Sequence, residues 1–415
     1  MKRFGFRGIG THVLSMPEPV EVQIVVDAPR VSWGDRLFLA SNLNGWHPRQ
    51  ERAVFKRLGQ TRFILLLLIP KGTILEFKIT RGRWDRAEVG TGGSALPNHR
   101  YKITEPCRID VEVADWQDRY PRLVPPHTMV GDVRSLGEFE IPLLDRKRQV
   151  FVYLPPGYEA DSTRRYPVMY MYDGQNLFDA STSFSGEWQV DETCERMIRA
   201  GVLPPLIVVG IYNGEADRLH EQSPWPNPHY DVLGEGRVFA EWVATGLKGE
   251  IDQCLRTLPG PEHTGIGGSS MGGLTSLYAA FRFPEVFGRV LAMSSAFWFN
   301  KHRIYPFIRD KGKNPGQRIY LDCGHYEEHG RNRLGPLRQS REMAQLLRSL
   351  GYEDGKDLLW VEDPYGQHSE ADWARRLPRA LKFLWGDAPR NELRSTVPAQ
   401  LPSPWNEYPG LKARP

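Results

Sequence analysis

The sequence predicts two domains: a small all-β sandwich, then a larger α/β domain in which helices cover both faces of a mostly parallel sheet. Three observations predict this fold class. The chain has 415 residues, which is more than one ordinary hydrophobic core accommodates. Apolar and polar residues alternate up to about residue 115, and after about residue 131 short apolar runs alternate with helical patterns. The change of period places the domain boundary between these regions.

The first region, residues 18–115, is predicted to consist of short strands. Every second residue is apolar in each of the runs "EVQIVVD", "ILEFKIT" and "CRIDVEV". Clusters of Gly, Asn and Pro such as "SNLNGWHP" separate these runs, as turns do between strands. Strict alternation with frequent turns predicts a small antiparallel β-sandwich. Residues 1–17 precede it as an N-terminal arm.

A linker is expected at residues 116–130, where "WQDRYPRLVPPHTMVGDV" carries three prolines and little periodicity. In the second domain, residues 131–386, apolar runs such as "PVMYMYD", "LIVVGIY" and "RVLAMS" indicate buried strands. Between the strands, "LTSLYAAF" and "REMAQLLRSLG" are predicted to form amphipathic helices. Buried strands alternating with amphipathic helices favour a mostly parallel sheet covered on both faces. Residues 387–415 are proline-rich and expected to form an irregular tail.

The composition argues against several classes of function. The formal charge of +4 is small for this length, so it predicts no nucleic-acid partner. The longest apolar run, "FILLLLIP", is too short to cross a bilayer, and the first twenty residues lack the apolar core of a secretory signal. The four cysteines are scattered without CxxC spacing, which predicts neither a zinc site nor a disulfide framework. We therefore expect a cytoplasmic protein without a membrane partner; its oligomeric state is left open.

The stretch "HTGIGGSSMGGLTSLYAAF" contains two adjacent serines among glycines. It lacks the Lys of a phosphate-binding P-loop, and Ser270 stands where a dinucleotide fingerprint needs its third Gly. The pattern G-x-S-x-G fits one frame only, "GSSMG", and this frame centres on Ser270. Such a motif forms a sharp strand-to-helix turn in which bulky neighbours do not fit. Ser270 is therefore the predicted nucleophile, Ser269 a local capping residue, and the N–H of Met271 an oxyanion donor.

This motif is typical of the α/β-hydrolase fold, in which an acid and then a histidine follow the serine along the chain. His368 follows the last strand pattern and precedes the C-terminal helix, so it is the predicted general base; the alternative is a polar residue that only begins that helix. The acid is expected in "DCGHYEE", where Glu327 is favoured and Glu328 and Asp322 remain alternatives. The chemistry of such a triad requires no metal and no organic cofactor.

The second oxyanion donor is expected in the loop "DGQNLFD", which follows the strand pattern "VMYMYD". Gly174 is expected to let the backbone approach the substrate, so the N–H of Gln175 is the predicted donor. Asp173 is a candidate substrate-binding residue, and it is equally suited to holding the loop through hydrogen bonds.

An ordered series of segments resembles the putative esterase (esterase D-like) family of α/β-hydrolases over about residues 130–386. The segments include "RYPVMYMYDGQNLFD", "GEWQVDE", "GIGGSSMGGLTSLYAAFRFPEVFG" and "GQHSEADWARRLPRALKFLW". That family includes feruloyl, acetylxylan and enterochelin esterases and mycolyltransferases. The resemblance implies that Ser270, Glu327 and His368 form the triad, with a small-molecule or sugar-linked ester as substrate.

The same resemblance gives expectations for three more residues. Trp298 matches a position that lines the acyl or alcohol pocket, and Arg218 and Glu221 match a recurring R-x-x-E motif expected to form a structural ion pair. The implied activity is that of a carboxylic ester hydrolase acting through an acyl-enzyme. An acyltransferase using the same triad is the alternative, followed by a non-catalytic glycan-binding protein with a vestigial hydrolase domain.

The first domain is similar to a starch-binding-type carbohydrate-binding module of family 20. The segments that carry this likeness are "LFLASNLNGWHPRQ", "LEFKITRGRWDRAEVG" and "NHRY". Trp46 and Trp84 match positions where such modules stack on sugars, because the face of an indole ring fits the apolar face of a pyranose. Two interpretations therefore remain for these residues: glycan binding, or packing within a small β-sandwich.

Overall fold

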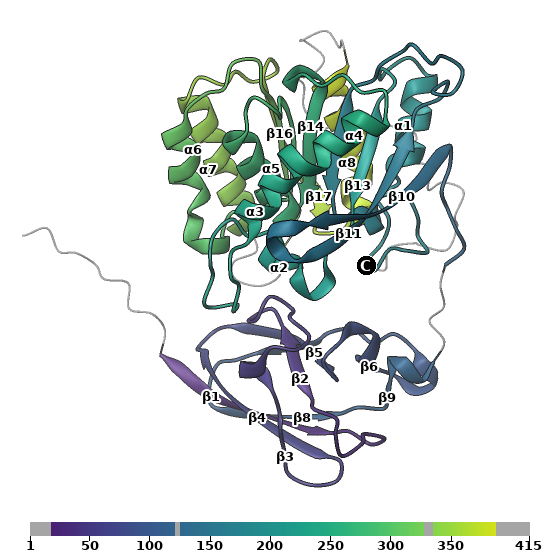
Figure 1. Ribbon diagram of the computed structural model, residues 1–415. Helices are drawn as coiled ribbons and strands as arrows, with labels where there is room; N and C mark the ends of the chain where they lie inside the picture. Colours follow the sequence, from purple (N-terminus) through teal and green to yellow (C-terminus); the bar gives the residue numbers. More distant parts are fainter. Residues whose placement is uncertain (1–17, 121–124, 328–334, 387–415) are drawn as a thin grey trace, which may run out of the picture. The chain divides into compact units, whose positions relative to one another are not determined.

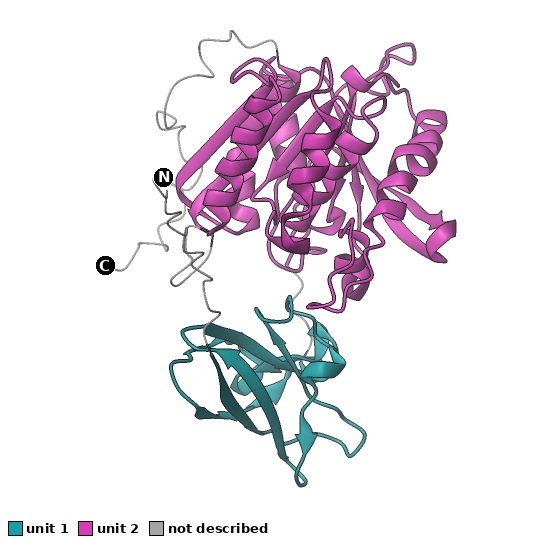
Figure 2. Ribbon diagram, turned by 90° about the vertical axis from the view of Figure 1, so that its left-hand side faces the viewer, with its two compact units in different colours: residues 1–123 teal, residues 124–415 magenta. Residues whose placement is uncertain are grey.

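The computed structural model describes residues 18–120, 125–327 and 335–386, and the chain divides into two compact units (Figures 1 and 2). Unit 1 is Met1–Leu123 and unit 2 is Val124–Pro415. The division falls inside the segment expected as a linker. The expected N-terminal arm and the C-terminal tail lie outside the described residues.

Unit 1 is built from small β-sheets around one core, as the alternating pattern predicts. Residues Ile24 and Phe63 from one sheet and Leu39 and Phe77 from another are buried in the same cluster. Trp116, expected to begin the linker, is fully buried in this core. The strand order is β3 (Lys56–Arg57), β4 (Arg62–Pro70), β1 (Pro19–Asp27), β8 (Cys107–Glu112) in the first sheet, β2 (Phe38–Ser41), β5 (Ile74–Thr80), β7 (His99–Lys102) in the second, and β6 (Glu88–Val89), β9 (Asp115–Trp116) in the third.

One pairing in unit 1 differs from the antiparallel arrangement expected from the sequence. Strands β1 and β8 are parallel, with Ile24 opposite Ile109, whereas β1 and β4 are antiparallel. After β4 the chain crosses to the second sheet and returns to the first only at β8, so β8 is not joined to β1 or β4 by a hairpin. Alternation of apolar residues reports which face of a strand is buried, and it does not report strand direction.

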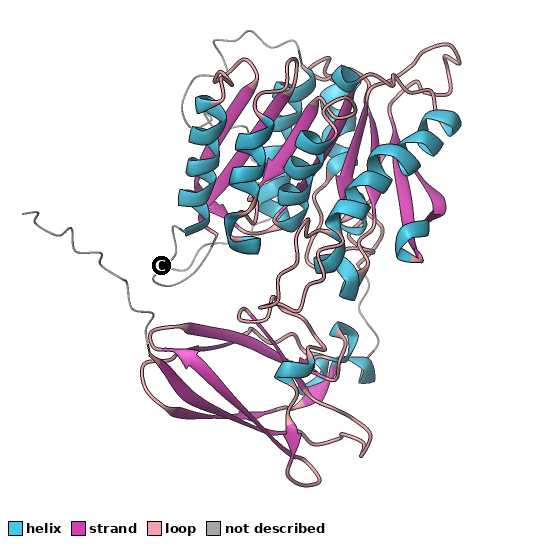
Figure 3. Cartoon of the chain, turned by 60° about the vertical axis from the view of Figure 1, so that its left-hand side comes forward, coloured by secondary structure: helices cyan, strands magenta, loops and turns pink. Residues whose placement is uncertain are grey.

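Unit 2 contains an eight-stranded, mostly parallel sheet, which confirms the predicted α/β-hydrolase fold (Figure 3). The strands from β12 onward run parallel to one another. At one edge, β11 is antiparallel both to β13 and to the edge strand β10. The strand order is β10 (Asp132–Ile141), β11 (Arg146–Leu154), β13 (Ile207–Ile211), β12 (Val168–Tyr172), β14 (Thr264–Ser269), β15 (Arg289–Met293), β16 (Arg318–Tyr326), β17 (Leu358–Gln367).

Helices cover both faces of this sheet, and the alternating side chains of its central strands fill two separate cores. Val168 and Tyr170 of β12 enter the core beneath α3 to α7, whereas Met169 and Met171 enter the core beneath α1 and α8. The helices are α1 (Val190–Arg199), α2 (Arg218–Glu221), α3 (Gly236–Glu241), α4 (Lys248–Cys254), α5 (Met271–Arg282), α6 (Ile304–Lys311), α7 (Gly335–Ser349) and α8 (Glu370–Trp385), with a π-helical segment, Trp242–Leu247, joining α3 to α4.

The two helices predicted as amphipathic differ in their surroundings. Helix α7 fits the expectation, because Met343 and Leu347 are fully buried and Gly351, two residues beyond its end, has a φ of +97°. Helix α5 does not fit it, since every residue from Met271 to Phe281 is buried. Its buried polar residues are hydrogen-bonded: Thr275 Oγ–H donates to Gln222 O in the neighbouring segment, and Ser276 Oγ–H donates to Gly272 O within the helix.

No helix in the described ranges combines the length and apolar character needed to cross a membrane. All four cysteines are free.

Candidate active site

Ser270 occupies the sharp turn between β14 and α5, as the G-x-S-x-G spacing predicts. Its φ is +55° and its ψ is −117°, a conformation that non-glycine residues rarely adopt. Strain of this kind costs on the order of 1–3 kcal/mol and persists only where the surroundings enforce it. Three backbone hydrogen bonds hold the residue: its N–H donates to Met293 O (3.0 Å), and its carbonyl accepts from the N–H groups of Leu274 (3.1 Å) and Ala296 (2.9 Å).

The neighbouring glycines are required by close approach at this turn. A Cβ on Gly268 would lie 3.0 Å from the carbonyl carbon of Gly272, and one on Gly272 would lie 3.2 Å from Cβ of Tyr172. A Cβ on Gly273 would lie 2.4 Å from Ser295 Oγ. Side chains at these positions would push α5 away from the sheet and release Ser270 from its conformation.

Glu327 and His368 form a hydrogen-bonded pair at the same edge of the sheet. Glu327 follows β16 and His368 follows β17, and Glu327 Oε2 lies 2.7 Å from His368 Nδ1. The other carboxylate oxygen accepts from Gly324 N–H (2.6 Å) and Ser294 Oγ–H (2.5 Å). Burial alone would raise the pKa of Glu327, but the hydrogen bond and charge of His368, the Ser294 hydroxyl and the Arg376 charge outweigh it and hold that pKa below its ordinary value.

Of the two alternatives for the acid, Asp322 has other partners. Arg376 Nε (2.8 Å), Ser294 N–H (3.0 Å) and Tyr320 OH (3.1 Å) all donate to its carboxylate, which is fully buried. Burial raises the pKa of Asp322 in spite of the Arg376 charge. The second alternative, Glu328, lies outside the described residues. Among the described acids, Glu327 is the one that contacts His368.

A buried polar network behind Glu327 was missed in the sequence. Ser294 Oγ, which donates to Glu327, also lies 2.9 Å from Trp373 Nε1 and 2.9 Å from Arg376 Nη2. Arg376 is 5% exposed, and its guanidinium also contacts Asp363 (3.1 Å). The sequence does contain an indication of this network, because Arg376 falls three residues after Trp373 and one before Leu377, on the apolar face of α8. A charged residue on that face indicates a buried ion pair.

The two predicted oxyanion donors lie at the ends of neighbouring parallel strands. Met271 is the first residue of α5, and Gln175 lies in the single helical turn Gly174–Asn176 after β12. Within the described ranges, neither backbone N–H donates to another protein group. Gly174 is also required by packing, because a Cβ there would lie 2.6 Å from the carbonyl carbon of Gly210, and its approach to the substrate stays a prediction. This glycine lets the turn pack on β13, and that packing fixes where the Gln175 N–H points.

Asp173 holds the same turn through its side chain. It has a φ of +58°, and its carboxylate accepts two hydrogen bonds from Arg218 (2.7 Å each), one from Asn213 Nδ2 (2.6 Å) and one from Gln222 Nε2 (3.0 Å). The ion pair expected between Arg218 and Glu221 is therefore not formed: Arg218 pairs with Asp173, and Glu221 has different partners.

Glu221 faces the opposite way from Arg218. Its carboxylate accepts from Arg148 Nε (2.9 Å) and Arg146 Nη1 (3.2 Å), both on β11. The R-x-x-E motif on α2 thus joins β11 to the turn that carries Gln175. Its Glu221 pairs with arginines of β11, and its Arg218 pairs with Asp173 at the start of that turn.

Trp298 follows the segment that is bonded to the nucleophile turn. Ala296, two residues earlier, donates to the carbonyl of Ser270. The indole is 36% exposed and makes edge-to-face contacts with Tyr230 and Phe299, at ring distances of 5.8 and 5.4 Å. Tyr230 and Phe299 also stack on one another at 5.1 Å. The three rings form a partly exposed aromatic cluster.

The two tryptophans of unit 1 that were candidates for glycan binding, Trp46 and Trp84, are both accessible to solvent. Trp84 opens a short 3₁₀ turn after β5 and is 47% exposed. Trp46, with a φ of +60°, lies half-buried in the loop after β2. Neither is part of the buried core of unit 1. Glycan binding by these residues stays a prediction.

A family model described as Putative esterase matches residues 141–384, which is more than half of the chain. The chain belongs to this family. The match covers the nucleophile turn, the Glu327–His368 pair and the sheet that carries them, so the esterase family membership and the α/β-hydrolase fold agree. The N-terminal β domain precedes the matched region.

Two curated proteins are similar to parts of this chain. It is 26% identical over 249 residues to the uncharacterized protein YbbA of Bacillus subtilis, a match that covers 58% of this chain and 93% of YbbA. It is 28% identical over 178 residues to the iron(III) enterobactin esterase of Dickeya dadantii, covering 42% of this chain and 36% of that enzyme. The chain thus spans about a third of the latter protein's length.

Solved structures support the fold over more of the chain. The enterobactin esterase FES from Shigella flexneri superposes with a TM-score of 0.51 at 18% identity, covering 89% of this chain and 93% of that one. The siderophore hydrolase EstB from Aspergillus nidulans superposes with a TM-score of 0.51 at 16% identity, covering 64% and 98%. At these identities the likeness establishes the fold.

Proposed function

We propose that this member of the family is a serine carboxylesterase in which Ser270, His368 and Glu327 form the catalytic triad. The observation that carries the proposal is the 2.7 Å contact between His368 Nδ1 and the buried Glu327 carboxylate, at the sheet edge where Ser270 occupies its strained turn. A carboxylate on Nδ1 directs the basic Nε2 lone pair outward, which is the tautomer that a serine hydroxyl requires.

The backbone links these three residues across neighbouring strands. Ser270 N–H donates to Met293, the next residue is Ser294, and Ser294 Oγ donates to Glu327. The Trp373 indole packs edge-to-face on the His368 ring at 5.0 Å, and its N–H points to Ser294. The imidazole is therefore oriented from two sides, by the Glu327 carboxylate and by the Trp373 ring.

In the proposed reaction, Ser270 Oγ attacks the ester carbonyl while His368 accepts its proton. The tetrahedral oxyanion receives hydrogen bonds from the N–H groups of Met271 and Gln175, and the first of these lies at the positive end of α5. His368 then returns the proton to the leaving alcohol, which gives an acyl-enzyme. Water, deprotonated by His368, completes the hydrolysis.

The substrate class that we propose is an ester with a flat, aromatic acyl group. The exposed edge of the cluster formed by Trp298, Tyr230 and Phe299 supports this choice, because aromatic rings favour offset or edge-to-face contact with other rings. The name of one relative, an iron(III) enterobactin esterase, agrees with an ester as the substrate.

The test of the function is labelling combined with turnover. The full-length protein is treated with a fluorophosphonate and its peptides are mapped by mass spectrometry, and hydrolysis of p-nitrophenyl acetate is followed in parallel. We expect one label per chain, on the peptide that contains Ser270, and turnover that the label abolishes. A label on another peptide, or no turnover with any ester, would reject the proposal and leave a vestigial hydrolase domain.

The same assay separates hydrolysis from acyl transfer. With glycerol or a sugar added as acceptor, a hydrolase releases free acid as the main product, whereas an acyltransferase forms the new ester in proportion to acceptor concentration. We expect free acid to dominate. Predominant formation of the acceptor ester would reassign the second step to transfer while retaining the triad.

Replacing Trp298 by Ala is expected to lower kcat/KM for an aromatic acyl ester, such as a feruloyl ester, by about 10-fold, since one aromatic contact contributes about 1 kcal/mol or slightly more. For p-nitrophenyl acetate, whose acyl group is too small to reach the cluster, we expect a change of less than about threefold. The two rate constants are measured on the same preparations. Equal losses with both esters would show that Trp298 supports the site instead of contacting the acyl group.

A further inference from the structure

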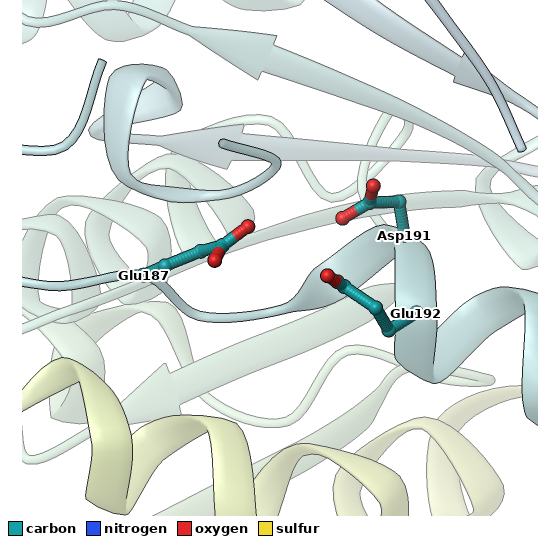
Figure 4. Close-up of side chains that lie close together, drawn as sticks. All are labelled: Glu187, Asp191 and Glu192. Carbon is teal, nitrogen blue, oxygen red and sulfur yellow. The ribbon is translucent and has the colours of Figure 1, made fainter. Parts of the chain in front are cut away.

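We infer that Glu187, Asp191 and Glu192 form a divalent-cation site, suited to Ca²⁺, at the start of helix α1 (Figure 4). Each residue offers one carboxylate oxygen, and these three oxygens lie within 4.8 Å of one another. Glu187 comes from the segment before the helix, and Asp191 and Glu192 come from its first turn. Figure 4 shows the three carboxyl groups directed toward one another.

Acidic residues in the first turn of a helix are common without a ligand, because the helix dipole favours them there. A second observation distinguishes this group. Asp191 has no exposed surface, and its Oδ1 atom has no hydrogen-bond partner among the described residues. Oε2 of Glu192 is likewise buried and without a partner. Buried carboxylate oxygens are normally paired with a donor or a cation.

Neighbouring residues donate hydrogen bonds to two other oxygens of the cluster, Asp191 Oδ2 and Glu187 Oε1. Val130 N–H donates to Asp191 Oδ2 (2.7 Å), and Thr128 Oγ–H donates to Glu187 Oε1 (2.9 Å). Within the described ranges, no Lys, Arg or His makes an ion pair with any of the three carboxylates. The described part of the protein thus provides no positive group to pair with the two buried oxygens that lack a partner, Asp191 Oδ1 and Glu192 Oε2.

The number of carboxylates favours Ca²⁺ over Mg²⁺, because Mg²⁺ is usually bound through one or two carboxylates and three gather here. Ca²⁺ binds oxygens at about 2.3–2.6 Å, so ligands on opposite sides of the ion are up to about 5 Å apart. The three oxygens lie within 4.8 Å of one another, which is inside that limit. Carboxylates are the ligands that Ca²⁺ prefers, and water completes its shell of six to eight oxygens.

The cation would stabilise the contacts among three segments of unit 2: the segment before β10, the start of α1 and the turn that carries Gln175. Val130 and Thr128 belong to the segment before β10, and the carboxylates belong to the start of α1. Between Glu187 and Asp191, Trp188 N–H donates to Asn176 O (2.8 Å), in the turn that carries Gln175. Trp188 also packs on Trp373 at 5.4 Å. The proposed ion therefore stabilises the base of this turn without contacting the substrate.

The test is Ca²⁺ binding by the full-length protein after treatment with a chelator and its removal. Calorimetry should show one Ca²⁺ per chain, with Mg²⁺ binding more weakly. The melting temperature should rise by about 5 °C at a 100-fold excess of Ca²⁺ over its Kd. In Asp191→Asn the calorimetric affinity should fall about 10-fold or more and the shift should disappear. The matched control is Glu342→Gln, which removes one exposed carboxylate from α7 and should keep both signals.

Two results would overturn the proposal. Absence of both heat and thermal shift with Ca²⁺, Mg²⁺ and Mn²⁺ would show that protons alone neutralise the cluster. An equal response in Asp191→Asn and Glu342→Gln would show that the ions act by general screening. If Asp191→Asn does not fold, the test variant is Glu187→Gln instead, because Glu187 is only half-buried. Circular dichroism checks the folding of each variant. None of these readouts depends on esterase activity.

Discussion

Ser270→Ala is expected to lower kcat for p-nitrophenyl acetate by about 10⁴- to 10⁶-fold and to abolish fluorophosphonate labelling. The substitution removes the hydroxyl proposed to form the acyl-enzyme, and in a comparable serine hydrolase the loss of the nucleophile alone costs about 10⁶-fold in kcat. Folding should be retained, because the three backbone hydrogen bonds of residue 270 do not involve its side chain. Initial rates, corrected for the uncatalysed reaction, provide the measurement.

The adjacent serine provides the control for this experiment. Ser269 is the last residue of β14, is buried, and has an ordinary strand pairing opposite Met293. Ser269→Ala should therefore keep the label and retain kcat within about 10-fold, which corresponds to no more than about 1.4 kcal/mol. If Ser269→Ala lost the label and Ser270→Ala kept it, the nucleophile would have been assigned to the wrong member of the pair.

Glu327→Gln is expected to lower kcat by about 10³- to 10⁴-fold with little change in KM. The amide removes the charge that stabilises the protonated imidazole and permits the wrong tautomer of His368, effects that cost about 10⁴-fold in the best-studied triad. The protein should remain folded, because Gln has the same shape and can still accept from Gly324 and Ser294. Steady-state kinetics across a range of ester concentrations separate kcat from KM.

Asp322→Asn is the matched control for the acid. It should reduce the free energy of unfolding by about 2 kcal/mol, because it weakens charged hydrogen bonds to a buried arginine, while kcat per folded molecule stays within about 10-fold. Urea unfolding measures the first quantity and active-site titration normalises the second. A 10³-fold loss of kcat in Asp322→Asn, with Glu327→Gln near wild type, would move the triad acid to Asp322.

Stability at low pH gives a second readout for Glu327. Its pKa in the folded state is held below the ordinary glutamate value, so its ionised form stabilises the fold above the unfolded-state pKa. This contribution is lost as the pH falls through the lower, folded-state pKa. Glu327→Gln has no such group, so the difference in unfolding free energy between wild type and mutant should shrink as the pH is lowered through that range. A constant difference would mean that the Glu327 pKa is not lowered.

The sequence determined the fold class and the nucleophile turn because both depend on local patterns. The glycines around Ser270 stand at fixed positions in a short motif, and the alternation of strands and helices reflects burial of each segment. The order of the triad along the chain, together with the position of His368 after the last strand pattern, then predicted His368 as the base. These are short-range features, and periodicity or spacing records them directly.

Only the tertiary structure distinguished the residues whose partners are far apart in the chain. Asp322 and Glu327 are five positions apart, and the position of Glu327 in the loop favoured it as the partner of His368 without excluding Asp322. The structure pairs Glu327 with His368 and Asp322 with Arg376. The same holds for Arg218, which pairs with Asp173 across 45 positions instead of with its neighbour Glu221. Whether two side chains meet depends on where strands of one sheet end, and sequence spacing does not record that.

The three carboxylates at the start of α1 illustrate the same limit. In the sequence, "GEWQVDE" supports the family resemblance and nothing more. The fold brings the Val130 and Thr128 segment against them, buries Asp191 completely and leaves one of its oxygens without a donor. The sequence by itself thus determined the fold and the residue at its nucleophile turn; the partners of each buried charge were decided by tertiary packing, because burial and pairing arise only when distant segments meet.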